Sequence, residues 1–472
     1  MASLVEDLRA AVGPDRVRAE PLELALYQRD ASNMTGRAAV VCFPLTTAEV
    51  RACVRAARRH GRPFLARGSG TGLAGGAVPL DDPVVIVTTK MDRIVEVDVD
   101  ERVATVQPGV LNLDLTKAVA RHGLHFAPDP SSQQSCSIGG NVATNSGGPH
   151  CLASGVTSTH VLGVEVVLPD GEVVVLGGVD PEPEGFDLRG AFVGGEGTLG
   201  IATEISVRLT PNPPTVRTML LDFADVDDGA ATVSAVIAAG IVPAAIEMMD
   251  ALITKAVEAF VHAGFPTDAA AILIVEVDGL EAGVEDAVKR VTEIGLAHGA
   301  RSVRVATDEA ERALIWKGRK NAFGAIARIK PNYYQHDTVV PRRRLVEVLR
   351  EVYAIAARHD LLVMNVFHAG DGNLHPLLVF DKREPGVMEH VLAAGEEIVR
   401  ASVAAGGVLS GEHGIGIEKR DFMPLMFSEA DLAAQDTLRR AFDPDGVANP
   451  HKVLPRGSRC GEVQHVPAGA WI

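Results

Sequence analysis

The sequence has little cysteine, no excess of positive charge and no long hydrophobic run, and each shortage excludes a class of protein. The five cysteines contain no C-x-x-C pair, which argues against a disulfide scaffold and against an iron–sulfur cluster. With 61 acidic and 45 basic residues the net charge is −16, so the chain has no overall electrostatic footprint for nucleic acid. From the cysteine usage we expect a reduced, cytoplasmic protein.

Signals for export or membrane insertion are also missing. The amino-terminal residues include acids early and lack an apolar core, unlike a signal peptide. Residues 229–246 are uncharged over 18 positions, the minimum for a membrane span, but they contain hydroxyl residues, two glycines and Pro243. We interpret this stretch as a buried helix that runs into a turn, and we expect no membrane span.

The coarse pattern predicts an α+β protein. The first 60 residues are expected to be helical, short β-rich runs follow, and residues 161–176 are expected to form a hairpin. Prolines at 211, 213 and 214 mark the best domain boundary. After it, strands alternate with helical patterns in βαβ-like units, and the last 17 residues form a polar tail. The expected domains are 1–213, 214–410 and a helical carboxyl-terminal segment, 411–472.

Glycine, in contrast, is abundant and clustered. Of the 47 glycines, 21 fall in five stretches that together span 44 residues. Glycine at this density is typical of backbone with positive φ or of close approach to a ligand. The stretches are residues 68–76, 139–148, 190–200, 370–372 and 406–416.

The first stretch contains a formal G-x-G-x-x-G pattern at Gly70, Gly72 and Gly75. A Rossmann dinucleotide fingerprint needs a helix directly after it, but the proline-containing sequence AVPLDDP follows. The pattern therefore predicts a loop whose consecutive N–H groups hold phosphate oxygens. Residues 135–148, SCSIGGNVATNSGG, have the same character. We expect the two loops to hold one pyrophosphate, with a set of tight turns as the alternative.

Two histidines flank a predicted turn in the sequence NVFHAGDGNLHPLLVF. Asp371-Gly372 is typical of a two-residue hairpin turn. That register places His368 directly opposite His375, with their Cβ atoms about 4.5–5.5 Å apart. Two imidazoles in this relation can chelate one metal ion.

A third ligand for such an ion is expected from the sequence GEHGIG, which offers Glu412 and His413 between glycines. Spacing alone does not decide which of the two is the ligand. A site with two histidines and one carboxylate keeps open positions, as catalytic sites do. Zn, Mn or Fe suits these donors, and hydrogen-bonded core histidines are the alternative interpretation.

Eight motifs spread over nearly the whole chain together resemble the FAD-linked oxidase family, which has the vanillyl-alcohol-oxidase/PCMH-type fold. Within that family the resemblance is to the FAD-binding subunits of glycolate oxidases and to D-lactate dehydrogenases. It implies a two-lobed FAD-binding domain, a substrate cap domain and a carboxyl-terminal segment that returns to the flavin. The motifs are ARGSGTGLAGG, APDPSS, CSIGGNVATNSGG, GGEGTLGI, GRKNAF, FHAGDGNLHP, SGEHGIG and FDPDGVANP.

The resemblance implies a set of FAD-binding residues. Some relatives attach the flavin to a histidine in the first glycine loop, but RGSGTG has none, so we expect non-covalent FAD. The implied residues are Pro44, Arg67, Gly68, Ser69, Gly70, Thr71, Gly72, Leu73, Gln107, Asp129, Ser132, Ser137, Gly139, Gly140, Asn141, Thr144, Asn145, Gly147, Glu196, Ile201 and Asn449.

The resemblance also implies oxidation of a 2-hydroxy acid to the 2-oxo acid, with a hydride passing to the flavin. A histidine suits the general base because its pKa lies near working pH, and a planar guanidinium suits the substrate carboxylate. The implied roles are metal ligands His368, His375 and Glu412, general base His413, and carboxylate partner Arg319.

The expected substrate is a small D-2-hydroxy acid such as glycolate or D-lactate. Relatives that act on hydroxy-diacids carry an extra basic residue shortly before a D-x-x-x-P motif, and here the matching position is Gln335. Three other functions stay open. They are a D-2-hydroxyglutarate-type dehydrogenase, a non-redox transferase of the alkyl-glycerone-phosphate synthase type, and a non-catalytic flavoprotein subunit.

Electrons that reach the flavin need an acceptor outside this chain, which has no iron–sulfur ligand set. The resemblance implies a second flavin-type subunit and an iron–sulfur subunit as partners. Such partners would hold a cytoplasmic protein peripherally at the inner membrane. A stand-alone enzyme that passes electrons to a quinone or a cytochrome is the alternative.

Overall fold

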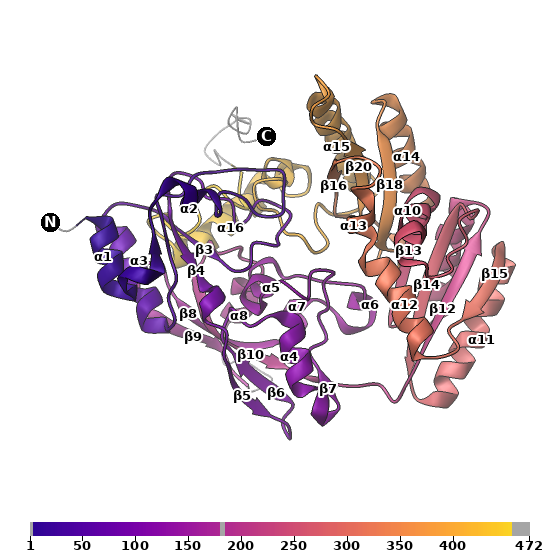
Figure 1. The fold of residues 1–472 in the computed structure, drawn as a ribbon, viewed down its shortest axis with the longest axis horizontal. Coiled ribbons are helices and arrows are strands. Elements are labelled where there is room, and N and C mark those ends of the chain that lie inside the picture. Colours follow the sequence, from indigo (N-terminus) through magenta and orange to yellow (C-terminus); the bar gives the residue numbers. More distant parts are fainter. Residues whose placement is uncertain (1–2, 180–184, 456–472) are drawn as a thin grey trace. The chain divides into compact units, whose positions relative to one another are not determined.

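The chain divides into two compact units in the computed structural model, which describes residues 3–179 and 185–455 (Figure 1). Unit 1 comprises Met1–Gly147, Gly155–Asn212 and Glu412–Ile472, and unit 2 comprises Gly148–Ser154 and Pro213–Gly411. The short segment Gly148–Ser154 thus belongs to unit 2 although both of its flanks belong to unit 1. The polar tail and Cys460 lie outside the described residues.

Unit 1 begins with a four-stranded sheet in the order β1-β2-β4-β3, in which β2, β4 and β3 are parallel. Helix α3 makes the crossover between parallel strands, and Thr46 caps it by accepting the N–H of Glu49. The prediction that the first 60 residues are helical is therefore wrong for β1 and β2. These two strands are too short to show a strand period in the sequence. The elements are α1 (Leu4–Val12), η1 (Pro14–Arg16), β1 (Val17–Arg18), α2 (Pro21–Ala25), β2 (Val40–Cys42), α3 (Thr47–Arg59), β3 (Phe64–Arg67), β4 (Val84–Val87) and η2 (Thr88–Lys90).

A second sheet of unit 1 is antiparallel, in the order β5-β6-β10-β8-β9. The hairpin expected over residues 161–176 is confirmed, since β8 pairs with β9. The elements are β5 (Ile94–Asp98), β6 (Val103–Val106), α4 (Asn112–Val119), η3 (Ala120–His122), β7 (Leu124–His125), α5 (Ile138–Thr144), α7 (Thr157–His160), β8 (Val161–Val167), β9 (Val173–Gly177), α8 (Leu188–Phe192), β10 (Ile201–Arg208), β11 (Thr210–Pro211), η5 (Arg420–Leu425) and α16 (Glu429–Phe442).

Unit 2 is built on one large sheet in the order β15-β12-β14-β13-β18-β19-β17, and the β16–β20 pair joins it through β18. Every strand pair described in it is antiparallel, so no two neighbouring strands form a βαβ unit. The strands β12 and β13, which α9 connects, nevertheless run parallel to each other with β14 between them. The expected βαβ-like unit is therefore present in split form. The strands are β12 (Thr215–Phe223), β13 (Ala245–Asp250), β14 (Ala271–Gly279), β15 (Ala300–Val305), β16 (Asn332–Gln335), β17 (Thr338–Val339), β18 (Leu362–His368), β19 (Asn373–Leu374) and β20 (Pro376–Phe380).

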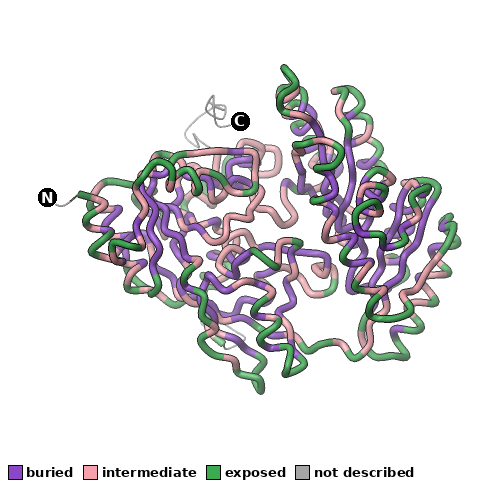
Figure 2. Tube along the Cα trace, in the orientation of Figure 1, coloured by how far each residue is buried: buried purple, intermediate pink, exposed green. Residues whose placement is uncertain are grey.

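Helices cover both faces of this sheet, and the central strands β13 and β14 are almost wholly buried, whereas most of the edge strand β15 is not (Figure 2). Alternate residues of β12 face opposite layers, because Met219 and Leu221 pack in one hydrophobic core and Leu220 packs in the other. Helices α9, α11, α14 and α15 contribute to the first core, and α10, α12 and α13 to the second. The helices are α6 (Cys151–Ser154), α9 (Val226–Ala238), α10 (Ala251–Val261), α11 (Glu281–Ala297), α12 (Glu309–Lys320), α13 (Ala322–Ile326), η4 (Arg342–Arg344), α14 (Leu345–Arg358) and α15 (Val387–Ala404).

The uncharged stretch 229–246 contributes to α9, a turn and the start of β13, as a buried helix running into a turn was expected to do. Among the described residues, no helix combines the length and the apolar character needed to cross a membrane.

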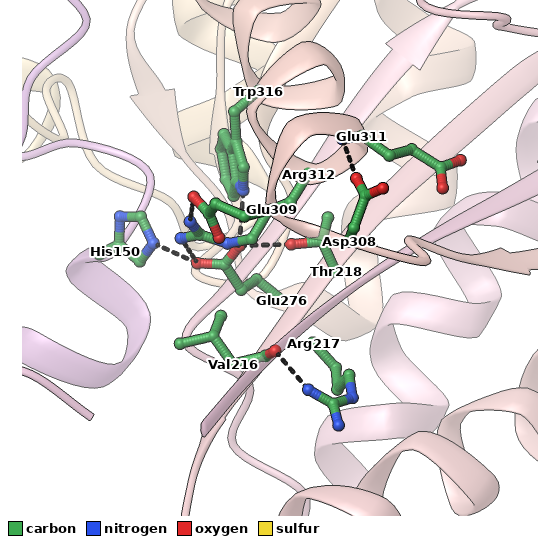
Figure 3. Close-up of polar contacts among 10 residues, drawn as sticks. All are labelled: His150, Val216, Arg217, Thr218, Glu276, Asp308, Glu309, Glu311, Arg312 and Trp316. Carbon is green, nitrogen blue, oxygen red and sulfur yellow. Dashed lines mark hydrogen bonds and ion pairs between the residues drawn. The ribbon is translucent and has the colours of Figure 1, made fainter. Parts of the chain in front are cut away.

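A buried carboxylate anchors helix α12 to the sheet (Figure 3). Glu276 on β14 accepts hydrogen bonds from Trp316 Nε1 at 2.6 Å, Thr218 Oγ1 at 2.5 Å and Arg312 Nε at 3.1 Å. His150 lies 3.2 Å from the other oxygen, with its ring 5.4 Å from that of Trp316. Burial alone would raise the pKa of Glu276, but the hydrogen bond with His150 and the charge of Arg312 outweigh it and lower the pKa to about 2.

We predict that Glu276→Gln destabilises the protein at neutral pH and that the loss fades in acid. A carboxyl whose pKa falls from 4.5 to about 2 on folding contributes about 3 kcal/mol above pH 4.5, and that contribution is lost as the pH falls toward 2. Urea titrations at a series of pH values measure the gap between wild type and variant. Glu309→Gln is the matched control, because it removes an exposed partner of the same Arg312. A gap that stays constant from pH 5 to pH 2 contradicts the assignment.

Candidate functional site

All 21 residues expected to bind FAD lie in unit 1. The first glycine stretch follows β3, and no helix comes after it, so the rejection of the Rossmann reading is confirmed. Arg67, at the end of β3, is buried, and its Nη1 donates to the carbonyl of Ala77 at 3.1 Å. Burial lowers the pKa of this guanidinium from its usual value. Because arginine nevertheless stays protonated in proteins, a positive charge stands beside the loop of N–H groups.

The two glycine stretches touch each other. A Cβ added at Gly68 would lie 2.4 Å from Oγ of Ser137 and 3.7 Å from the backbone nitrogen of Gly140. Side chains at Gly68 would thus push the loops apart. The sequence predicted that the two stretches act together, and the backbone brings them into direct contact.

The second stretch is not an open loop throughout, because residues Ile138–Thr144 form helix α5. Asn141 holds this segment together: its Nδ2 donates to Ser146 Oγ at 2.6 Å, and its Oδ1 accepts from Asn112 at 3.3 Å. Asn145 ends the helix in the left-handed region and accepts the N–H of Ser158. The side-chain amides of these two asparagines therefore shape the segment.

A dinucleotide phosphate fits the contact between the two stretches. The hydroxyl of Ser137 is buried and has no hydrogen-bond partner among the described residues. A buried hydroxyl without a partner is costly, and a phosphate oxygen would satisfy it. Gly72 has open space where a side chain would be. The residues present therefore fit the cofactor that the sequence implied.

The remaining expected FAD residues differ in their place in the fold and in which of their groups is available to a ligand. The buried side chain of Gln107 accepts the N–H of Arg93 at 3.2 Å. Ile201 packs its side chain in the core, so only its backbone is available to a ligand. Pro44 follows β2, and Asp129 and Ser132 lie in the segment before α5.

Glu196 and Asn449 connect distant parts of unit 1. The Nδ2 of Asn449 donates to the carbonyl of Glu196 at 2.7 Å and to that of Gly76 at 3.0 Å. The N–H of Glu196 donates to Ala143 in α5 at 2.8 Å. The two expected cofactor residues therefore join both glycine stretches to the GGEGTLG loop and to the NPHK sequence.

The carboxylate of Glu196 is buried against backbone rather than against a cation. Its oxygens accept the N–H groups of Ile415 at 2.6 Å and Gly416 at 2.8 Å. Burial raises the pKa of Glu196 to about 7, although these hydrogen bonds favour the ionised form. Burial likewise lowers the pKa of the nearby Lys452 to about 7.

The hairpin that carries the two histidines is present in unit 2, but the predicted register is wrong by two residues. His368 pairs with Asn373, and a four-residue loop closed by Gly372 N–H to Ala369 O replaces the two-residue turn. A shift of two keeps each side chain on its own face of the sheet. His375 is therefore the diagonal neighbour of His368, and their rings lie 5.1 Å apart.

Two buried carboxylates face these imidazoles. Glu247 Oε1 lies 2.7 Å from His368 Nδ1, and Asp337 Oδ1 lies 3.5 Å from His375 Nε2. A carboxylate on Nδ1 fixes the tautomer that leaves Nε2 as the nitrogen able to bind a metal. Paired imidazoles with adjacent carboxylates are the donors that divalent transition-metal ions take, so this part of unit 2 fits a metal.

Glu247 also holds the arginine expected to bind substrate. Its Oε2 accepts from Arg319 Nε at 2.6 Å, and both residues are almost fully buried. The Nη1 of Arg319 has no hydrogen-bond partner among the described residues. One carboxylate therefore orients both an imidazole and a guanidinium, and part of that guanidinium remains available to an anion.

Glu412 and His413 belong to unit 1, where the chain enters it for the last time. Their side chains lie 3.9 Å apart, from His413 Nε2 to Glu412 Oε1. The preceding residue, Gly411, belongs to unit 2 and donates its N–H to Asp337 at 3.1 Å. Glu412 is thus the next residue in the chain after one that is bonded to the carboxylate beside His375.

Sequence reasoning missed the roles of Glu247 and Asp337. Both are fully buried. A signal was available for Glu247, since it stands alone as a charge within the apolar part of AIEMMD, and an acid inside a buried strand needs a partner. Asp337 gave no such signal, because its segment has no clear period.

Profiles of two known families match the chain. That of the FAD binding domain matches residues 38–177, and that of FAD linked oxidases, C-terminal domain, matches residues 212–453, more than half of the chain. The chain belongs to the FAD-linked oxidase family. It is thus an FAD-dependent oxidoreductase, and the resemblance inferred from its motifs is confirmed.

Named relatives of this FAD-linked oxidase cover nearly its whole length. It is 46% identical over 450 residues to glycolate oxidase subunit GlcD of Escherichia coli (strain K12), covering 95% of this chain and 90% of that one. It is 33% identical over 440 residues to a D-lactate dehydrogenase of Anaerostipes hadrus, covering 91% of each.

The expected fold class is confirmed by a solved relative of low sequence identity. p-Cresol methylhydroxylase with substrate bound superposes with a TM-score of 0.80 at 18% identity, covering 95% of this chain and 96% of that one. The PCMH-type FAD-binding fold with a carboxyl-terminal oxidase domain therefore describes this α+β protein.

We predict that Gly68→Ala lowers FAD occupancy. The added Cβ would meet Ser137 Oγ at 2.4 Å and separate the two glycine stretches. The ratio of flavin to protein absorbance in the purified variant measures the loss. Gly178→Ala is the control, because nothing lies within 4 Å of a Cβ there. Full FAD occupancy in Gly68→Ala would show that the contact of the two stretches does not shape the site.

Proposed function

We propose that this FAD-linked oxidase oxidises a small D-2-hydroxy acid, glycolate or D-lactate, to the 2-oxo acid with metal assistance. The observation that carries the proposal is the network around Glu247, which joins a buried guanidinium to a pair of imidazoles inside unit 2. A guanidinium and a metal site are what the carboxylate and hydroxyl of a hydroxy acid need. The names of the two relatives above support the same substrate class.

Arg319 binds the substrate carboxylate in this proposal. Its Nε is held by Glu247, which leaves Nη1 to donate to an anion. A guanidinium suits a carboxylate because its planar donors match both oxygens. Burial of Arg319 strengthens the interaction, since little water competes. Glu247 fixes the orientation of the guanidinium before substrate arrives, and it leaves the other side of the guanidinium available.

His368, His375 and Glu412 hold the metal, which we propose to be Zn, Mn or Fe. Glu247 sets the tautomer of His368, and Asp337 faces His375. A bound divalent ion lowers the pKa of a coordinated hydroxyl. Glu412 directly follows Gly411 in the chain, and the N–H of Gly411 is bonded to Asp337.

His413 takes the proton of the substrate hydroxyl. An imidazole suits this task because its pKa lies near neutral pH, and Glu412 stands 3.9 Å from its Nε2. FAD, when bound, accepts the hydride from the α-carbon. The roles of Glu412 as ligand and His413 as base follow the family pattern.

The flavin is held non-covalently by the 21 residues of unit 1 in this proposal. The described residues contribute hydroxyl and N–H donors where the two glycine stretches meet, and Arg67 adds a positive charge beside them. Among the described residues of the first stretch there is no histidine to form a flavin bond.

A monocarboxylic substrate is favoured by Gln335. It is a buried residue of β16, where relatives acting on diacids carry a cation. A neutral amide provides no counter-charge for a second carboxylate. Electrons then pass from the flavin to partner subunits, a second flavin-type chain and an iron–sulfur chain, in keeping with the word subunit in the name of the 46% identical relative. Such partners would hold the protein peripherally at the inner membrane.

We predict that glycolate or D-lactate bleaches the flavin of the metal-replete protein under anaerobic conditions. L-Lactate and D-2-hydroxyglutarate are the comparison substrates, expected to react more slowly. Removing the metal with a chelator should abolish bleaching while FAD stays bound, and adding back Zn, Mn or Fe should restore it. Absence of bleaching by every 2-hydroxy acid tested would sink the proposed function.

We predict that His413→Ala slows flavin reduction by about 10²–10⁴-fold, the usual contribution of a general base. The FAD content should stay at the wild-type level, because no FAD contact is assigned to this side chain. Rapid-mixing measurements of flavin absorbance at saturating substrate give the rate. His298→Ala, which removes an exposed imidazole at the end of α11, is the control. Unchanged reduction in His413→Ala excludes His413 as the base.

A further inference from the structure

The loop of residues 412–416 carries two proposed reaction residues and has no regular structure of its own. Gly414 and Gly416 both have positive φ, at 86° and 54°. A loop of this kind has many accessible conformations in isolation, because glycine restricts the backbone little. Something outside the loop must therefore hold Glu412 and His413 in one position.

The carboxylate of Glu196 supplies the first anchor. One oxygen accepts the N–H of Ile415 and the other that of Gly416, so two consecutive donors are bound by the two ends of one anion. These two hydrogen bonds favour the ionised form of the carboxyl, and a hydrogen bond to that form is roughly twice as strong as a neutral one. Gly414 also approaches Glu196, since a Cβ there would lie 2.7 Å from Oε1.

The first glycine stretch supplies the second anchor. The carbonyl of Ala74 accepts the N–H of Ile417 at 2.9 Å and that of Glu418 at 3.2 Å. A Cβ at Gly416 would lie 2.0 Å from the same oxygen, so only glycine allows this approach. The carboxyl-terminal half of the loop is thus fixed to two other loops of unit 1.

Glu196 is itself held in place. Its N–H is bonded to Ala143, its carbonyl accepts from Asn449, and its side chain is buried. The positive charges of Lys419 and Lys452 act on its carboxylate. Glu196 is therefore held through its backbone, and both of its carboxylate oxygens accept hydrogen bonds from the loop.

We propose that Glu196 is a positioning residue for the reaction, and that its carboxylate fixes the loop in which Glu412 and His413 act. The proposal rests on the proposed function for what those two residues do. The resemblance of the motifs implies only that Glu196 lines the flavin site. Its contacts give the side chain a separate task, which is to hold the loop of residues 412–416.

The direct test is Glu196→Gln. The amide keeps the size of the side chain but has one acceptor oxygen, and its NH₂ group faces an N–H donor. We expect the amides of residues 412–417 to exchange hydrogen faster. FAD should be retained, because both carboxylate oxygens of Glu196 are taken by the loop and the other 20 expected FAD residues are unchanged. At saturating substrate, flavin reduction should slow by about 10–100-fold, because displacement of a reacting group by about 1 Å costs that much. The substrate dissociation constant should change little.

Glu165→Gln is the matched control. Glu165 is a carboxylate of the same unit that accepts hydroxyl hydrogen bonds from Thr47 and Thr203, distant in sequence from the loop. It should leave both the exchange of residues 412–417 and the reduction rate at the wild-type level. Glu196→Asp, which keeps the charge but retracts it by one methylene, replaces the glutamine variant if the latter does not fold.

A double variant separates positioning from a general effect. If Glu196 acts through the loop that carries His413, combining Glu196→Gln with His413→Ala should slow flavin reduction by less than the product of the two separate losses. Multiplied losses would overturn the proposal. Unchanged loop exchange in Glu196→Gln, or loss of FAD from it while Glu165→Gln keeps FAD, would also overturn it. Hydrogen exchange tests the anchoring even if no 2-hydroxy acid reduces the wild-type flavin. A failure of the proposed function can therefore be told apart from a failure of the proposal for Glu196.

Discussion

A single buried carboxylate, Glu196, is the interaction on which the arrangement of unit 1 depends. Around it meet helix α5, the NPHK sequence and the SGEHGIG loop, which are far apart along the chain. A charge without a counter-ion in direct contact is expensive to bury, and backbone N–H groups are what compensate it. The glycines of these stretches let the backbone come close enough to do so.

Buried carboxylates in unit 2 are compensated too, but by side chains rather than by backbone N–H groups. Glu247 is buried between a guanidinium and an imidazole, and Glu276 between Arg312, Trp316, Thr218 and His150. Removing one partner from such a network leaves an uncompensated charge, so each network enforces one geometry. Glu276 fixes helix α12, and the same helix carries Arg319 toward Glu247. Structural and functional polar groups thus share one helix.

The histidine hairpin shows why part of a wrong prediction can survive. Asp371-Gly372 indicated a two-residue turn, whereas the loop has four residues and the pairing is shifted by two. Because side chains alternate with a period of two, an even shift preserves the face on which each lies. His368 and His375 therefore still meet, as diagonal rather than direct neighbours. A shift of one would have separated them.

The sequence by itself determined the family, the α+β class, the contact of the glycine stretches and the proximity of the two histidines. These follow from local signals: motif residues, turn chemistry and glycine density. Only the tertiary structure decided the antiparallel order of the unit 2 sheet, and the partners of Glu196, Glu247 and Asp337. Such contacts join residues separated by up to 253 positions, and a local period carries no information about which distant strand or loop will pack against them.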